Sequence, residues 1–85
     1  MDKKLLDMIV CPVTKLPLEL LDSERLEQVN AAIAAGRVRN HGDNQVDDRF
    51  TEALIRRDGH VVYPVVDGIP ILLEEEAVDW NQVVD

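Results

Sequence analysis

Residues 58–73 have the sequence DGHVVYPVVDGIPILL, which is the strongest β-strand signal in the chain. Two Asp-Gly pairs, at residues 58–59 and 67–68, separate apolar runs that are rich in valine and isoleucine. Asp-Gly favours a two-residue hairpin turn, because both central positions of that turn adopt positive φ. The pattern therefore predicts a β-meander. Its segments are residues 60–66, residues 69–73 and, before them, residues 51–57, which form either a strand or a short helix leading into one.

Pro64 and the residues before the meander add detail to this sheet. Pro64 has no N–H to donate to a strand ladder, so we expect it at a sheet edge or at a bulge. The alternating sequence Leu-Glu-Leu at residues 18–20 predicts another short strand. Residues 2–9 predict a short helix that ends at Pro12, because proline fixes its own φ and restricts the residue before it.

The clearest helix signal covers residues 23–35, SERLEQVNAAIAA. Leu26, Val29 and Ile33 fall on one stripe of such a helix, and Gly36 follows where a left-handed C-cap is expected. The sequence thus predicts a single α+β domain over residues 1–85, with a small antiparallel sheet and a helical insertion at about 22–50. The tail, at about 77–85, is expected to be loosely held unless Trp80 docks.

Size and composition set the class of protein. The chain has 85 residues, of which 46% are hydrophobic and 31% charged. It is too apolar for a disordered tail and too interrupted by charge for a membrane span. Its single cysteine excludes an internal disulfide and a four-cysteine zinc site. Asp7 interrupts the only early apolar run, so there is no secretory signal pattern and we expect a cytoplasmic protein.

The net charge of −8 is unevenly distributed. Residues 1–57 hold ten acidic and nine basic side chains, whereas residues 58–85 hold seven acidic side chains and no lysine or arginine. A nucleic-acid surface needs clustered Lys and Arg, so direct nucleic-acid binding is not expected. The acidic end is either a solubilising face or a surface that attracts a basic protein partner.

Cys11 is the candidate for thiol or metal chemistry. A catalytic thiol needs a base, and His41 and His60 are the two histidines of the chain. Their positions in the sequence do not bring either one next to Cys11, and a lone cysteine beside an apolar run more often behaves as a small buried hydrophobic residue. A small metal- or thiol-dependent enzyme using Cys11 is therefore only an alternative function.

Apolar residues occupy both parities of the strand positions in residues 61–66 and 69–73. A small sheet with one solvated face should alternate instead. Either the helix at residues 23–35 covers the second face, or a partner does. An apolar strand edge is also a natural place for a partner to add a strand.

Two motifs give the chain a resemblance to a known family. The sequences L-L-x-x-I-V-C-P-V at residues 5–13 and Y-P-V-V-D-G-I-P-I-L-L at residues 63–73 resemble the YcaR-like small bacterial proteins of the tRNA methyltransferase subunit 112 family. The resemblance implies a zinc-ribbon-like β domain with a helical insertion. It also implies a non-catalytic role, the activation of S-adenosylmethionine-dependent methyltransferases.

The resemblance also indicates what has become of the family's metal site. Cys11 matches the first cysteine of the family's C-P-x-C pair, Thr14 stands at the second, and Arg56 stands where short bacterial members often have another cysteine. We therefore expect the metal site to be lost, with no cofactor bound.

By the resemblance, the function is to bind and stabilise a protein partner, a methyltransferase of the translation machinery. A self-associating structural protein, homodimeric when alone, is the other alternative. The expected partner contacts are the surplus apolar residues of the meander: Val61, Tyr63, Val65, Ile69, Pro70, Ile71, Leu72 and Leu73.

Overall fold

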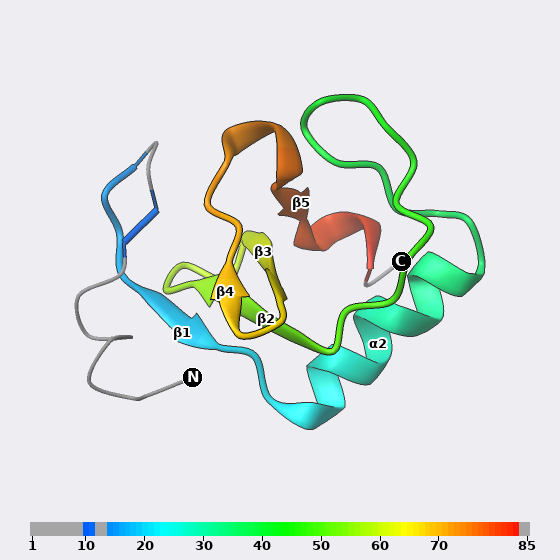
Figure 1. Ribbon diagram of the computed structural model, residues 1–85, viewed down its shortest axis with the longest axis horizontal. Coiled ribbons are helices and arrows are strands. Elements are labelled where there is room, and N and C mark those ends of the chain that lie inside the picture. The colour runs from blue at the N-terminus through cyan, green and yellow to red at the C-terminus, as the bar shows by residue number, and fades with distance from the viewer. Residues whose placement is uncertain (1–9, 12–13, 84–85) are drawn as a thin grey trace.

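The computed structural model describes residues 10–11 and 14–83 (Figure 1). These residues form an antiparallel sheet and one α-helix, which confirms the predicted α+β class. The helix predicted at residues 2–9 lies outside the described residues. The elements in chain order are β1 (Leu18–Leu20), α2 (Ser23–Ala34), β2 (Glu52–Arg56), β3 (Val61–Val66), β4 (Ile69–Pro70), the 3-10 helix η1 (Glu74–Glu76), β5 (Val78–Asp79) and the 3-10 helix η2 (Trp80–Gln82).

The sheet is built around β3, in the order β1-β2-β3-β4, with β5 also paired to β3. β4 pairs with Val65 and Val66, whereas β5 pairs with Val61 and Val62. Pro64 therefore lies in a central strand, but opposite the gap between β4 and β5. Its carbonyl still accepts a hydrogen bond from the N–H of Ile71 at 2.9 Å. Pro64 has no N–H to donate, and neither β4 nor β5 pairs with β3 at its position. A central strand can therefore tolerate this proline.

The two Asp-Gly turns differ from each other. Asp67 and Gly68 have φ values of 52° and 77°, as the predicted two-residue turn requires. Only Gly59 has a positive φ in the first turn, so the prediction was wrong for Asp58. Asp58 instead accepts hydrogen bonds on its carboxylate from the N–H of His60 and from Arg56. This side-chain bonding gives a longer turn between β2 and β3.

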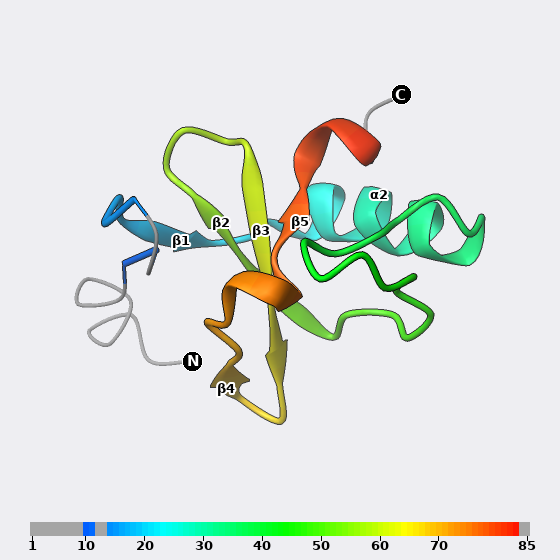
Figure 2. The ribbon, with the colours of Figure 1, turned by 90° about the horizontal axis from the view of Figure 1, so that it is seen from above.

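The helix α2 ends as its sequence predicts. Gly36 has a φ of 74° and follows the C-cap residue, and the N–H of Arg37 returns to the carbonyl of Ala32 at 3.1 Å. From there residues 38–51 return along α2 to the start of β2, as both views show (Figure 1, Figure 2). This returning segment therefore lies beside α2 and leads into β2.

Two apolar clusters form the core. One joins Val29 and Ile33 of α2 to the sheet residues Ala53, Ile55 and Val62. The other gathers residues of the opposite strand parity. The helix thus covers one face of β2 and β3, as one of the two sequence alternatives predicted. The second cluster contains Cys11, Leu18, Leu54, Val61, Tyr63, Val65 and Ala77, with Leu72 packed against it.

Trp80 docks, which is the condition under which the sequence did not predict a loosely held tail, and residues 77–83 are part of the fold. Ala77 and Val78 are buried, β5 is part of the sheet, and Trp80 packs against the helix-side core. The N–H of Trp80 also donates to the carbonyl of His60 at 2.8 Å. The apolar pattern was too short to predict β5, because its two residues gain their burial from a distant strand.

Candidate protein-docking surface

The predicted contact residues divide into a buried and an exposed group. Val61, Tyr63 and Val65 lie in the second core cluster and are at most 5% exposed. Burial inside the chain removes them from the surface that a partner can reach. The surplus apolar character of β3 thus has an internal explanation, and the external surface must come from β4 and its neighbours.

The exposed apolar residues lie around the β3–β4 turn. Val66, Ile69 and Leu73 are 52%, 63% and 54% exposed, respectively. We call these three residues the hairpin surface. Pro70, Ile71 and Leu72 continue it as half-exposed residues. A second exposed apolar group, Val10, Leu16 and Leu20, lies at and before β1.

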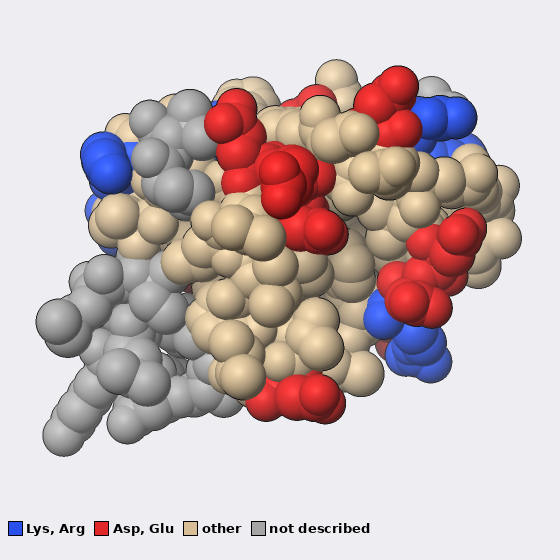
Figure 3. Space-filling view, turned by 45° about the horizontal axis from the view of Figure 1, so that its top comes forward, with Lys and Arg blue, Asp and Glu red and all other residues tan. Residues whose placement is uncertain are grey.

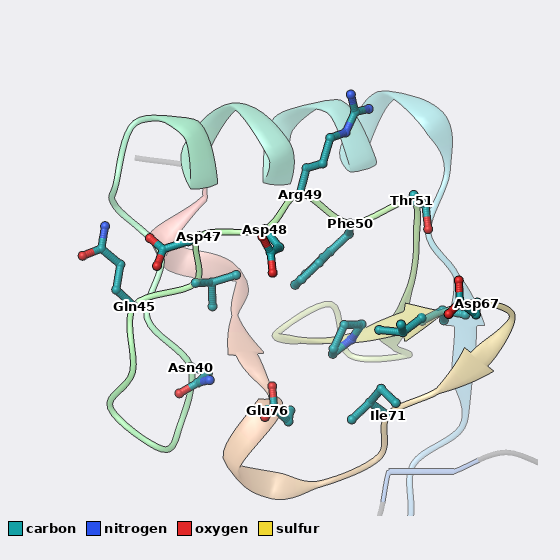
Figure 4. A pocket seen from close by; sticks show the side chains of 14 residues that line it. Asn40, Gln45, Asp47, Asp48, Arg49, Phe50, Thr51, Asp67, Ile71 and Glu76 are labelled. Carbon is teal, nitrogen blue, oxygen red and sulfur yellow. The ribbon is translucent and has the colours of Figure 1, made fainter.

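A groove of about 600 Å³ opens beside the hairpin surface. Its walls come from the segment 45–51, from the end of β3 with the following turn, and from η1. Phe50 and Ile71 point into the groove from opposite walls (Figure 4). The volume lies within the range of protein ligand sites. The lining comprises Asn40, Gln45, Val46, Asp47, Asp48, Arg49, Phe50, Thr51, Pro64, Val65, Val66, Asp67, Ile71 and Glu76.

Phe50 is fixed in the groove wall by the side chain of Asn30 on α2. The Asn30 Nδ2 donates to the carbonyl of Phe50 at 2.9 Å, and its Oδ1 accepts from the N–H of Phe50 at 2.7 Å. The returning segment therefore has a firm anchor just before β2. Sequence reasoning missed Asn30, because an Asn in the middle of a helix carries no signal of its distant partner.

Acidic side chains dominate the charge around the groove. Asp47, Asp48, Asp67 and Glu76 line it, whereas Arg49 is its single basic lining residue. Acidic residues on this side surround an uncharged surface, with Lys and Arg towards its margins (Figure 3). The surface thus combines apolar contact area with negative potential.

Cys11 and Arg56 form a second polar arrangement, on the far side of β2 and β3. The Cys11 Sγ lies 3.1 Å from the hydroxyl of Tyr63, and Arg56 Nη2 lies 2.8 Å from a carboxylate oxygen of Asp58. The hydrogen bond to Asp58 is the main reason that the pKa of Arg56 is raised, while burial opposes it and Cys11 adds to it. Burial and the bond to Cys11 raise the pKa of Tyr63.

The two histidines lie in a loop and in a turn, respectively. The His41 Nε2 lies 2.8 Å from a carboxylate oxygen of Asp79, which ties the loop after α2 to β5. His60 is exposed in the turn before β3. Cys11 is fully buried, so it lacks the partial exposure that is typical of reactive thiols, although Arg56 lies near it.

Comparison with known proteins identifies the family. A family profile described as "Trm112p-like protein" matches residues 2–68. The chain belongs to the Trm112p-like family. It is 39% identical over 77 residues to a UPF0434 protein of Hydrogenovibrio crunogenus, covering 91% of this chain and 75% of that relative.

A solved structure shares the Trm112p-like fold of this chain. The solution NMR structure of a protein from Xylella fastidiosa is 42% identical, with a TM-score of 0.80, and covers 98% of this chain and 86% of that one. Another relative is much longer. The tetraacyldisaccharide 4'-kinase of Verminephrobacter eiseniae is 39% identical over 77 residues, which are 91% of this chain but 12% of the kinase.

The Trm112p-like chain described here does not offer a fitting zinc site. Thr14 is exposed and its Oγ1 accepts a 3.4 Å hydrogen bond from the N–H of Leu16. Arg56 contributes a permanent positive charge beside Cys11. Across residues 10–11 and 14–83, no three His, Cys, Asp or Glu side chains converge as metal ligands do. These residues do not match the thiolate and imidazole donors of structural zinc sites, and the zinc-ribbon likeness stays a prediction.

Membrane insertion by a helix finds no support in this part of the chain. Within the described ranges, no helix has both the length and the apolar character needed to cross a bilayer.

Proposed function

We propose that this chain is a non-catalytic subunit that binds and stabilises an S-adenosylmethionine-dependent methyltransferase of the translation machinery. The observation that carries the proposal is the exposed hairpin surface of Val66, Ile69 and Leu73, which stays accessible although the neighbouring residues 61–63 and 65 of β3 are buried. Membership of the Trm112p-like family supports a protein-binding role at a coarse level. The methyltransferase is the partner that the family resemblance implies.

The mechanism is mass action. A subunit that binds only the folded state of an enzyme shifts that enzyme towards folding. At a free concentration 100 times the dissociation constant, the stabilisation is about 2.7 kcal/mol. Covering an apolar edge of the partner also keeps that edge from pairing with other chains.

The contact area needs more than the hairpin surface. A standard interface covers about 800 Å² on each partner. That is roughly a seventh of the 5352 Å² that this chain exposes. β4 contains only two residues, so an added strand gains few backbone hydrogen bonds there. We therefore expect the contact to spread over residues 71–73 and into the adjoining groove.

Co-purification from the native cell tests the proposal. The tagged full chain should recover a methyltransferase, and the double variant Ile69→Asp/Leu73→Asp should lose it. Leu16→Asp/Leu20→Asp is the matched control, because it places the same charges in the other exposed apolar group. Light scattering of the free chain reports self-association. If the two variants recover equal amounts of methyltransferase, the hairpin surface is not the contact.

A tetraacyldisaccharide 4'-kinase is a second candidate partner, and one observation favours it. The Verminephrobacter eiseniae protein of that name carries a region similar to nearly all of this chain as a small part of its length. Two units that share one polypeptide in one organism are natural partners as separate chains in another. The same co-purification decides between them, because recovery of the kinase instead of a methyltransferase would replace the first candidate.

A further inference from the structure

We propose that the groove beside the hairpin surface binds an extended segment of the partner protein in which an apolar residue is flanked by lysines or arginines. This inference rests on the proposed function, since it names the chemistry of what the partner inserts. It goes beyond the hairpin surface, which has no charge preference of its own.

The floor of the groove selects an apolar side chain. Phe50 and Ile71 point into it from opposite walls (Figure 4), and Pro64 and Val65 close it from β3. Val65 is buried, so the floor is backed by the core and cannot easily collapse inward. An aliphatic side chain of a guest segment would bury its surface against these residues.

The rim of the groove selects positive charge. The carboxylates of Asp48 and Glu76 lie on opposite sides and are directed towards the groove, whereas Arg49 points away from it, towards α2 (Figure 4). Asp47 and Asp67 extend the negative rim at its ends. A lysine or arginine next to the apolar residue of the guest segment would thus have carboxylates on either side.

The walls are held in position before any guest arrives. Asn30 fixes the backbone of Phe50 through two hydrogen bonds. On the other side, the N–H of Gly42 donates to the carbonyl of Glu75 at 2.9 Å and holds η1 beside the loop. A Cβ at Gly42 would lie 3.2 Å from Glu75, so the two segments approach closely. Preformed walls lower the ordering cost of binding.

Charge complementarity decides the class of occupant. Residues 58–85 contain no lysine or arginine, and the whole chain carries −8. Phosphate groups of nucleic acid or of an anionic lipid surface would be repelled by the four carboxylates around the groove. A basic and apolar protein segment is attracted and, at close range, desolvated.

Titration of the ¹⁵N-labelled full chain with short capped peptides tests the inference. The probe carries a Leu-Val pair flanked on each side by two lysines. One control peptide replaces the lysines by aspartates, and another replaces the Leu-Val pair by two serines. Amide shifts are expected at residues 45–51, 64–67 and 71–76 with the probe, and not with either control. Raising the salt from about 50 mM to about 500 mM should weaken binding several-fold.

Charge-neutralising variants give the quantitative test. Asp47→Asn/Asp48→Asn should weaken binding of the probe by roughly five- to tenfold at low salt. Glu24→Gln/Glu27→Gln is the matched control, because it removes two charges from the exposed side of α2. The two double variants therefore have the same net charge. Equal weakening by both variants would show only a general charge effect and would overturn the assignment to the groove.

The two proposals can fail separately. If the native partner is lost with Ile69→Asp/Leu73→Asp but is retained, with unchanged salt dependence, by Asp47→Asn/Asp48→Asn, the groove inference is overturned and the proposed function stands. If the probe binds the groove as expected but no enzyme is recovered from the cell, the groove inference stands and the proposed function fails.

Discussion

The side chain of Asn30 and the backbone of Phe50 exchange two hydrogen bonds across 20 positions of sequence, at 2.9 Å and 2.7 Å. One side-chain amide thereby satisfies both backbone polar groups of Phe50, which are partly buried. The pair joins the middle of α2 to the entry of β2. It thus links the helix, the sheet and the wall of the groove in a single contact.

Replacing Asn30 by alanine should therefore destabilise the fold and loosen the groove. The change leaves the N–H and carbonyl of Phe50 without this partner, at an expected cost of about 1–3 kcal/mol in the free energy of unfolding. Urea denaturation measures the loss. Gln28→Ala, at an exposed position of the same helix, should change stability by less than about 0.5 kcal/mol. Alanine has a higher helix propensity than either asparagine or glutamine, so propensity cannot cause the loss. A loss for Asn30→Ala no larger than that for Gln28→Ala would mean that the hydrogen bonds to Phe50 contribute little.

Tyr63 should make the stability of the fold fall in alkaline solution. Burial and the contact with Cys11 raise the pKa of Tyr63 above its ordinary value of 10.0. Below pH 10 the phenol is protonated in both states and its stabilisation is complete. Above pH 10 the unfolded chain loses the proton while the folded chain keeps it, so stability falls by up to about 1.4 kcal/mol per pH unit.

The variant Tyr63→Phe separates this effect from other alkaline titrations. Denaturation midpoints of both chains are measured from pH 8 to pH 11.5. Above pH 10 the midpoint of the wild type should fall relative to the midpoint of Tyr63→Phe, which has no phenol to ionise. A difference that stays constant over the whole range would show that Tyr63 does not ionise on unfolding.

Asp58 should titrate at an unusually acidic pH as long as Arg56 is present. The side-chain hydrogen bond from Arg56 is the largest cause that holds the pKa of Asp58 below 3.8, and the N–H of His60 adds to it. Carboxyl ¹³C titration of the wild type and of Arg56→Met should show the pKa of Asp58 rising in the variant. An unchanged titration of Asp58 would mean that the turn alone sets its pKa.

Much of the architecture follows from local sequence rules, whereas the docking surface does not. The apolar stripe with Gly36 predicted α2, and Asp67-Gly68 predicted the β3–β4 turn, because these signals depend on residues close in the chain. The burial of Tyr63 and Val78 depends on segments that meet only after folding. The predicted contact residues could therefore not be divided into core and surface from the pattern alone.

The groove was beyond prediction for the same reason. Its walls combine segments 45–51, 64–67 and 71–76, and the polar loop carried no motif. The family resemblance predicted Cys11, Thr14 and Arg56 as degenerate metal positions. Only the structure shows that Arg56 engages Asp58 and lies near Cys11.

Zinc should leave the stability of this chain unchanged. Arg56 brings a positive charge to the place where the family resemblance predicts a thiolate, and a divalent cation would be repelled there. Thermal unfolding is measured with stoichiometric zinc and with a chelator, and elemental analysis follows purification. Thr14→Cys/Arg56→Cys is the informative variant, since restored thiols should bind zinc more tightly than the wild type. A wild-type chain purified with one equivalent of zinc would contradict the expectation.

Val78 should behave as a core residue although it lies only seven positions before Asp85. It is fully buried in the helix-side cluster and pairs with Val62 of β3. Val78→Ala removes two methyl groups and leaves a cavity, so the free energy of unfolding should fall by about 2 kcal/mol. Val66→Ala makes the same chemical change at a position that is 52% exposed, and it should cost less than about 0.5 kcal/mol. Urea denaturation of both variants measures the two losses in the free energy of unfolding. If Val78→Ala costs no more than Val66→Ala, residues 77–83 are the loosely held tail that the sequence first indicated, and β5 contributes nothing to the stability of the sheet.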